Sequence, residues 1–172
     1  GNLGANLSIT EDLNSLISGD YTCTIIDNNS CQETHIVTII EPPAITADPI
    51  IKIDISCNGL TDGSAIIANI NGGTPFAGNS YNYLWQDAFL TQVSTNASTG
   101  SILSEGSYSC IISDANSCTL TSYTTIIDPP LITADSTTNT DISCNGLTDG
   151  SASVLNPSGG TPFTGGNSYT YE

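Results

Sequence analysis

The chain repeats itself with a period of 87 residues. The twelve-residue segment DISCNGLTDGSA at 54–65 returns unchanged at 141–152, and GGTPF at 72–76 returns at 159–163. Three cysteines recur at the same interval, so that Cys23, Cys31 and Cys57 match Cys110, Cys118 and Cys144. A fixed period of this length indicates an array of similar domains.

The period also sets the domain boundaries. We expect one complete repeat at 44–130, preceded at 1–43 by the C-terminal half of one repeat and followed at 131–172 by the N-terminal half of another. A chain cut inside a repeat at both ends is expected to belong to a longer protein. In this register the residue after Glu172 would match Trp85 and is expected to be aromatic.

Short runs of isoleucine, threonine and tyrosine alternate with turn residues throughout the repeat, which predicts an all-β fold. Tyr108 lies two residues before Cys110 in EGSYSC, the position of the tyrosine corner in immunoglobulin-like sandwiches, and Trp85 is a candidate core tryptophan. The sequence thus predicts tandem immunoglobulin-like β-sandwich repeats. Asn58, Gly59, Asp62 and Gly63 are turn formers and predict a tight corner between two strands.

Charge and hydrophobicity exclude several functions. The chain has 17 acidic residues and one cation, Lys52, which argues against binding to nucleic acid or to an anionic membrane surface. No apolar run is long enough to insert in a membrane. The 22 isoleucines can form a core, so disorder is not expected. Six cysteines in a chain poor in lysine favour an extracellular location.

The order of the motifs resembles the SprB repeat. The motifs are CNGLTDGS, GGTP, YNYLW, GSY, DANSC and the closing DPP, and the resemblance covers the whole chain. It implies a very large secreted adhesin of Bacteroidota, attached to the outer membrane, exported by the type IX secretion system and active in attachment and gliding motility. Cys23 and Cys110 depart from the family, which usually has a β-branched residue there.

The cysteines are expected to form disulfides, with two alternatives for the pairing. The resemblance favours Cys57 with Cys118, because the family shares these two positions. Sandwich geometry favours Cys57 with Cys110, provided that both lie near the same end of the sandwich. Either choice leaves one thiol per repeat, and the same alternatives apply to the matching positions Cys23, Cys31 and Cys144.

Little in the sequence indicates catalysis, so no enzyme activity and no cofactor are expected. His35 is the only histidine, which argues against a serine triad and a zinc site. Asp62, Asp114 and Asn116 lie in predicted corners and are candidate calcium ligands, although turn formation explains them equally well. Ser136 follows Asp135 in a pattern that fits bacterial O-glycosylation.

The expected function is a stalk or filament segment of this adhesin. Its partners would be neighbouring repeats, a surface polysaccharide or substratum, and the gliding and secretion machinery. One alternative is a purely structural surface-layer or fibre protein. Another is a carbohydrate-binding module of a secreted enzyme, which the strict period disfavours.

Overall fold

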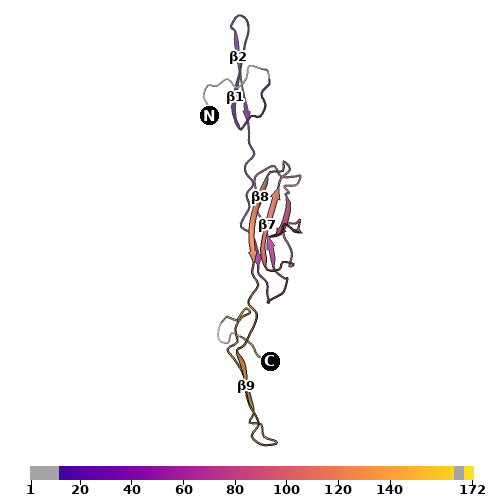
Figure 1. Ribbon diagram of the computed structural model, residues 1–172. Coiled ribbons are helices and arrows are strands. Elements are labelled where there is room, and N and C mark those ends of the chain that lie inside the picture. Colours follow the sequence, from indigo (N-terminus) through magenta and orange to yellow (C-terminus); the bar gives the residue numbers. More distant parts are fainter. Residues whose placement is uncertain (1–11, 165–168) are drawn as a thin grey trace. The chain divides into compact units, whose positions relative to one another are not determined.

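The computed structural model describes residues 12–164 and 169–172 and is built of β-strands (Figure 1). All ten strands pair in antiparallel fashion, and no helix occurs in the described residues. The all-β prediction is therefore confirmed. The chain divides into two compact units, Gly1–Ala44 and Ile45–Glu172.

A four-stranded sheet forms one layer of the complete repeat. It contains β5 (Asn82–Asp87), β6 (Gln92–Ser94), β7 (Gly106–Ser113) and β8 (Thr119–Ile126) in the order β6-β5-β7-β8. Strand β7 has the alternating pattern of a half-buried strand, with Tyr108, Cys110 and Ile112 all buried. Strand β6 lies at the edge of this sheet, where a strand needs few apolar residues.

A smaller sheet provides the other layer. Strands β3 (Ile51–Ile53) and β4 (Ser64–Ile66) pair with each other. Two single bridges extend this layer, one between Thr46 and Asn71 and one between Gly63 and Leu103. Segments 44–47 and 101–104 join this layer only through these isolated bridges. Each contributes one core side chain, Ile45 and Leu103 respectively.

The core lies between these two layers, and Trp85 is its largest residue. Trp85 has no exposed surface, lies opposite Cys110 in the sheet and donates its indole N–H to the carbonyl oxygen of Asn96 at 3.0 Å. The hydroxyl of Tyr108 donates to the carbonyl oxygen of Ser104 at 3.1 Å. The core position predicted for Trp85 is confirmed, and the Tyr108 hydrogen bond to a carbonyl four residues upstream has the form of a tyrosine corner.

Two further hairpins flank the complete repeat in sequence. Strands β1 (Gly19–Ile26) and β2 (Gln32–Ile39) pair with Gly19 opposite Ile39, and 87 residues later Gly106 lies opposite Ile126. Strands β9 (Ser136–Thr140) and β10 (Ser151–Leu155) form the other hairpin. The Tyr21 hydroxyl donates to the Ile17 carbonyl oxygen at 2.9 Å, repeating the corner of Tyr108.

Candidate functional site

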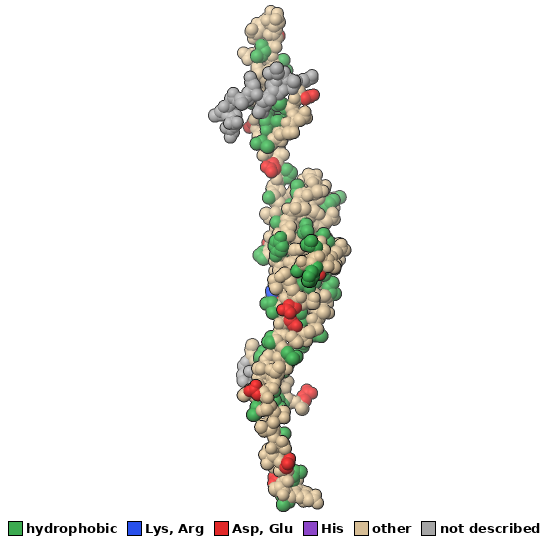
Figure 2. Space-filling view, in the orientation of Figure 1, with side chains coloured by type: hydrophobic (Ala, Val, Ile, Leu, Met, Phe, Trp, Pro, Cys, Tyr) green, Lys and Arg blue, Asp and Glu red, His purple; other side chains and the backbone are tan. Residues whose placement is uncertain are grey.

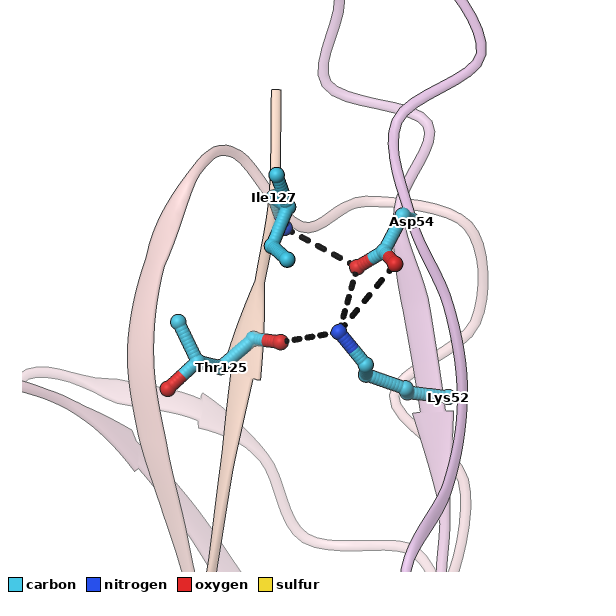
Figure 3. Close-up of polar contacts among 4 residues, drawn as sticks. All are labelled: Lys52, Asp54, Thr125 and Ile127. Carbon is cyan, nitrogen blue, oxygen red and sulfur yellow. Dashed lines mark hydrogen bonds and ion pairs between the residues drawn. The ribbon is translucent and has the colours of Figure 1, made fainter. Parts of the chain in front are cut away.

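Lys52, the one cation of the chain, forms hydrogen bonds to the last strand of the complete repeat and to Asp54 (Figure 3). The Lys52 ammonium donates to both carboxylate oxygens of Asp54, at 2.8 and 3.1 Å, and to the carbonyl oxygen of Thr125 at 2.7 Å. Asp54 in turn accepts the backbone N–H of Ile127 at 2.9 Å. These contacts occupy Lys52 within the fold, so it serves here as a structural cation.

The repeated segment DISCNGLTDGSA continues this attachment beyond β8. Asn58 donates its side-chain amide to the Pro129 carbonyl oxygen at 2.9 Å and to the Asp128 carboxylate at 3.2 Å. The N–H of Gly59 donates to the same carboxylate at 3.0 Å. We call Asp54, Asn58, Gly59 and Asp128 the C-terminal clasp, because they hold the segment through which the chain leaves the repeat.

The corner predicted within the repeated segment is present, but its two glycines serve different purposes. Gly59 has a φ of +81°, which only glycine adopts without strain. Gly63 has no such φ; a Cβ built there would lie 2.7 Å from Ile126 Cγ2 and 2.9 Å from the Leu103 carbonyl oxygen. Asp62 closes the corner by accepting the Ser56 N–H at 3.1 Å and the Ser56 hydroxyl at 2.5 Å.

Asp114 organises the opposite end of the repeat, in the turn between β7 and β8. Its carboxylate accepts the N–H of Asn116 at 2.9 Å, of Cys118 at 2.8 Å and of Thr74 at 2.7 Å. Only 2% of Asp114 is exposed. The GGTPF turn is thereby fixed to this hairpin, and Gly73 is required because a Cβ would lie 2.6 Å from the Asp114 carboxylate.

The calcium candidates from the sequence do not form a common site. Asp62 lies at the C-terminal clasp, whereas Asp114 and Asn116 lie beyond the other end of β8. The Asn116 side-chain amide donates to the Thr74 hydroxyl at 3.0 Å. Among residues 12–164 and 169–172, no three His, Cys, Asp or Glu side chains cluster as metal ligands. Asp62 and Asp114 accept N–H groups within their own corners, and Asp114 and Asn116 also bond to Thr74 of the GGTPF turn.

The two ends of the repeat mark where the chain enters and leaves. Ile45, the first core residue, lies against Gly73 beside Asp114, because the same hypothetical Cβ would lie 2.8 Å from Ile45 Cγ1. The chain leaves past Asp128 at the C-terminal clasp. Strand β8 runs between these ends over eight residues, which at about 3.4 Å per residue places them roughly 24 Å apart.

Hydrogen bonds hold the pKa of several carboxyls below its ordinary value of 3.8. The pKa of Asp54 is lowered most by the hydrogen bond from the Lys52 ammonium. The pKa of Asp62 is lowered most by the Ser56 hydroxyl. The pKa of Asp114 is lowered most by the backbone N–H of Thr74. A lowered folded-state pKa means that the unfolded chain binds more protons in acid. The associated stability is present above the unfolded-state value and is lost as pH falls through the folded-state value.

We therefore expect the complete repeat to become less stable below about pH 4 and to show little change from about pH 5 to 7. Urea unfolding followed by tryptophan fluorescence at each pH measures this. Asp114→Asn should flatten the acid limb, because the variant lacks one of the groups whose pKa folding lowers. An equally steep acid limb in Asp114→Asn would contradict the assignment.

The structure corrects both predicted disulfide pairings. All six cysteines are free thiols. Cys118 immediately precedes β8, whereas Cys57 lies beside the clasp at its far end, so their separation far exceeds the roughly 7 Å limit for a disulfide between Cα atoms. Cys110 lies in the middle of β7, opposite Trp85 and Ser122, and not near the end that holds Cys57. The pairing of Cys57 with Cys110 assumed that both residues lie near the same end of the sandwich, and the strand register shows that they do not.

Cys110 and its match Cys23 should differ sharply in reactivity. Burial raises the pKa of the Cys110 thiol to about 12, and none of its surface is exposed, whereas Cys23 is exposed. Because the thiolate is the nucleophile, dilute native chain treated with iodoacetamide should label Cys23 at least 100-fold faster than Cys110. Peptide mass spectrometry gives both rates, and comparable rates would show that β7 is not packed as described.

The remaining predicted positions lie in ordinary surroundings. Ser136 is the first residue of β9 and is exposed. His35 lies on β2, with its Nε2 atom 3.9 Å from the Glu33 carboxylate and 62% of its side chain exposed. Neither side chain is held in a pocket by the contacts the structure describes.

Sequence reasoning found the corner residues and Asp114 but missed the roles of Lys52, Asp54 and Asp128 in holding the end of the repeat. Asp54 and the closing proline motif recur with the 87-residue period, which was the available signal. The period gave no such signal for Lys52, because Asn139 occupies the matching position. The Asn139 side-chain amide donates to the Asp141 carboxylate at 2.9 Å. That substitution keeps the contact while removing the charge, which indicates a structural role.

The described residues include no helix long and apolar enough to cross a membrane. Comparison with known proteins adds no identification: the chain matches no protein-family model, and no curated protein matches it.

Proposed function

We propose that the chain is part of a tandem array of immunoglobulin-like β-sandwich repeats with an 87-residue period, and that the array is the stalk of a very large cell-surface adhesin. In this proposal the array serves attachment and gliding motility. The protein is extracellular, attached to the outer membrane and exported by the type IX secretion system. These last features follow from the resemblance of the motifs to the SprB repeat.

The observation that carries the stalk proposal is the path of the chain through the complete repeat. The chain enters beside Asp114 and leaves beside Asp128, at opposite ends of β8. Repeats with this path can be joined in series, so that each adds its length to a filament. Hydrogen bonds at both ends, from Thr74 to Asp114 and from Gly59 to Asp128, support load-bearing along this line.

Three features support the immunoglobulin-like architecture. The sheet order β6-β5-β7-β8 is that of the C′-C-F-G sheet in such sandwiches. The tyrosine corner occurs at Tyr108 and again at Tyr21, one 87-residue period earlier. Trp85 lies opposite Cys110 in the core, in the place of the strand C tryptophan.

The surface chemistry favours partners other than polyanions. Seventeen acidic residues and an engaged Lys52 leave no cationic patch, so neutral surface polysaccharide or an abiotic substratum fits better than nucleic acid or an anionic membrane. Neighbouring repeats are the nearest protein partners. The gliding and secretion machinery would act on the whole protein.

Antibody Fab fragments raised against the purified chain test the proposal on cells that produce the protein. We expect them to label unpermeabilised cells and to reduce attachment to an uncharged polystyrene surface. Surface labelling with unchanged attachment would instead favour a surface-layer or fibre protein. Labelling only after permeabilisation would contradict an exposed stalk, and a catalytic domain in the same protein would favour a carbohydrate-binding module of an enzyme.

A further inference from the structure

The repeated corner contains an Asn-Gly pair, Asn58–Gly59, a dipeptide prone to spontaneous loss of the asparagine side-chain nitrogen. Glycine has no Cβ to shield its backbone nitrogen, so this nitrogen can reach Cγ of the preceding asparagine. Both residues are exposed and accessible to water. The pair returns at Asn145–Gly146, whereas another pair, Asn71–Gly72, is matched by Ser158–Gly159. The corner thus keeps its asparagine in both repeats although the pair is chemically labile.

In the folded repeat, the C-terminal clasp engages both reacting groups. The side-chain amide of Asn58 donates to the Pro129 carbonyl oxygen at 2.9 Å and to the Asp128 carboxylate at 3.2 Å. The N–H of Gly59, whose nitrogen would have to attack, donates to the same carboxylate at 3.0 Å. The adjacent negative charge disfavours removal of the proton from this nitrogen. The reaction therefore requires the C-terminal clasp to open first.

The reaction needs only water. Once its proton is removed, the Gly59 nitrogen attacks Cγ of Asn58 and forms a cyclic imide, and the side-chain nitrogen leaves with that proton as ammonia. Water then opens the imide at either of its two carbonyl carbons and gives aspartate or isoaspartate at position 58. The net change is the loss of ammonia and the addition of water, so no oxidant or reductant takes part.

The product cannot form the same contacts. Aspartate has only acceptor oxygens when it is ionised, so it would place a carboxylate where the Asn58 amide now donates to Asp128 and Pro129. The two like charges repel each other. Lys52, the one cation of the chain, is already engaged by Asp54, and acidic side chains are visible along the surface (Figure 2). No free cation therefore compensates the new charge.

We propose that Asn58 is a deamidation site that the C-terminal clasp keeps unreactive, and that its reaction leaves the clasp permanently open. Opening of the C-terminal clasp by heat or by tension along the chain permits the reaction. The segment that follows β8 then loses its attachment irreversibly. The inference rests on the contacts of the complete repeat and is independent of any role in adhesion.

The native chain carries its own comparison. Asn145–Gly146 lies in the same twelve residues and the same kind of turn, with a φ of +85° at Gly146 and +81° at Gly59. The position that matches Asp128 lies outside the chain, so this second pair has no clasp here. At mildly alkaline pH, Asn58 should deamidate about 10-fold or more slowly than Asn145, because the hydrogen bonds of the clasp must break first. Equal rates would overturn the proposal.

Peptide mass spectrometry measures both rates. Digestion with pepsin at acidic pH limits further reaction, and peptides that extend beyond the twelve identical residues distinguish the two sites. Isoaspartate among the products is expected from the cyclic imide, and aspartate alone would contradict this route.

Asp128→Ala removes the acceptor of both reacting groups and tests the role of the C-terminal clasp directly. Deamidation at Asn58 should accelerate toward the rate at Asn145. Asn71 reports whether the variant has unfolded, because its side-chain amide donates to the Asn69 carbonyl oxygen at 3.0 Å and its rate should not change. An unchanged rate at Asn58, or an equal acceleration at Asn58 and Asn71, would overturn the proposal.

Asn58→Asp reproduces one product of the reaction. It should lower the midpoint of thermal unfolding of the complete repeat by about 4 °C or more, since repulsion replaces the hydrogen bonds that Asn58 donates. Asn145→Asp introduces the same charge into the same twelve residues without a clasp and should leave this transition unchanged. Calorimetry measures both variants. Equal midpoints would show that a carboxylate at position 58 does not open the C-terminal clasp and would overturn the proposal.

Discussion

Trp85→Ala should lower the free energy of unfolding of the complete repeat by about 3–5 kcal/mol, because it removes a side chain with no exposed surface from the centre of the core. At about 0.05–0.15 kcal/mol per residue, a domain of this size has roughly 4–13 kcal/mol in total. The substitution therefore removes a large part of the stability. Urea unfolding followed by far-ultraviolet circular dichroism measures the loss without needing the tryptophan signal.

Trp85→Phe is the matched control. It keeps an aromatic ring against Cys110 but loses the indole N–H that donates to the carbonyl oxygen of Asn96. We expect a smaller loss, about 1–3 kcal/mol, from the unpaired carbonyl and the reduced volume. If alanine cost no more than phenylalanine, Trp85 would not be packed as the structure describes.

Gly63→Val should destabilise the complete repeat by about 3 kcal/mol or more through overpacking. The new Cβ would lie 2.7 Å from Ile126 Cγ2 and 2.9 Å from the Leu103 carbonyl oxygen, and the second of these atoms belongs to the backbone. The bridge between Gly63 and Leu103 must then open or shift. Calorimetry should show a lower midpoint for the unfolding of this unit.

Gly150 offers the control for this substitution. It matches Gly63 one period later, but its nearest contacts with a hypothetical Cβ are at 3.3 Å. Gly150→Val should leave the main unfolding transition unchanged, because it lies in the flanking half-repeat. A similar loss from both variants would mean that the glycine is required by the local corner and not by the packing of the two layers.

The sequence predicted the parts of the fold that depend on local pattern. A short run of β-forming residues at 107–113 predicted a strand where β7 lies, and Tyr108, two residues before Cys110, predicted a tyrosine corner. Asn58 and Gly59 predicted a turn because their preferences are local. In each case the determining residues lie within about ten positions of one another.

The features that sequence reasoning missed depend on strand register and on contacts between distant segments. Thr74 donates to Asp114 across 40 residues, and Lys52 donates to Thr125 across 73 residues. The disulfide predictions failed for the same reason, since the position of Cys110 along β7 decides which cysteines can meet. No local preference encodes these distances.

We expect residues 44–130 to form one mechanical unit, entered and left at opposite ends. Single-molecule stretching of the chain by its termini tests this most directly. At about 3.6 Å per residue, 87 residues extend to roughly 310 Å, and subtracting the folded length of roughly 24 Å gives an increment of about 290 Å. The flanking two-stranded hairpins should yield without a separate peak. We predict one unfolding event with this increment. An increment near 600 Å, which corresponds to all 172 residues unfolding together, or extension without any event, would contradict the account.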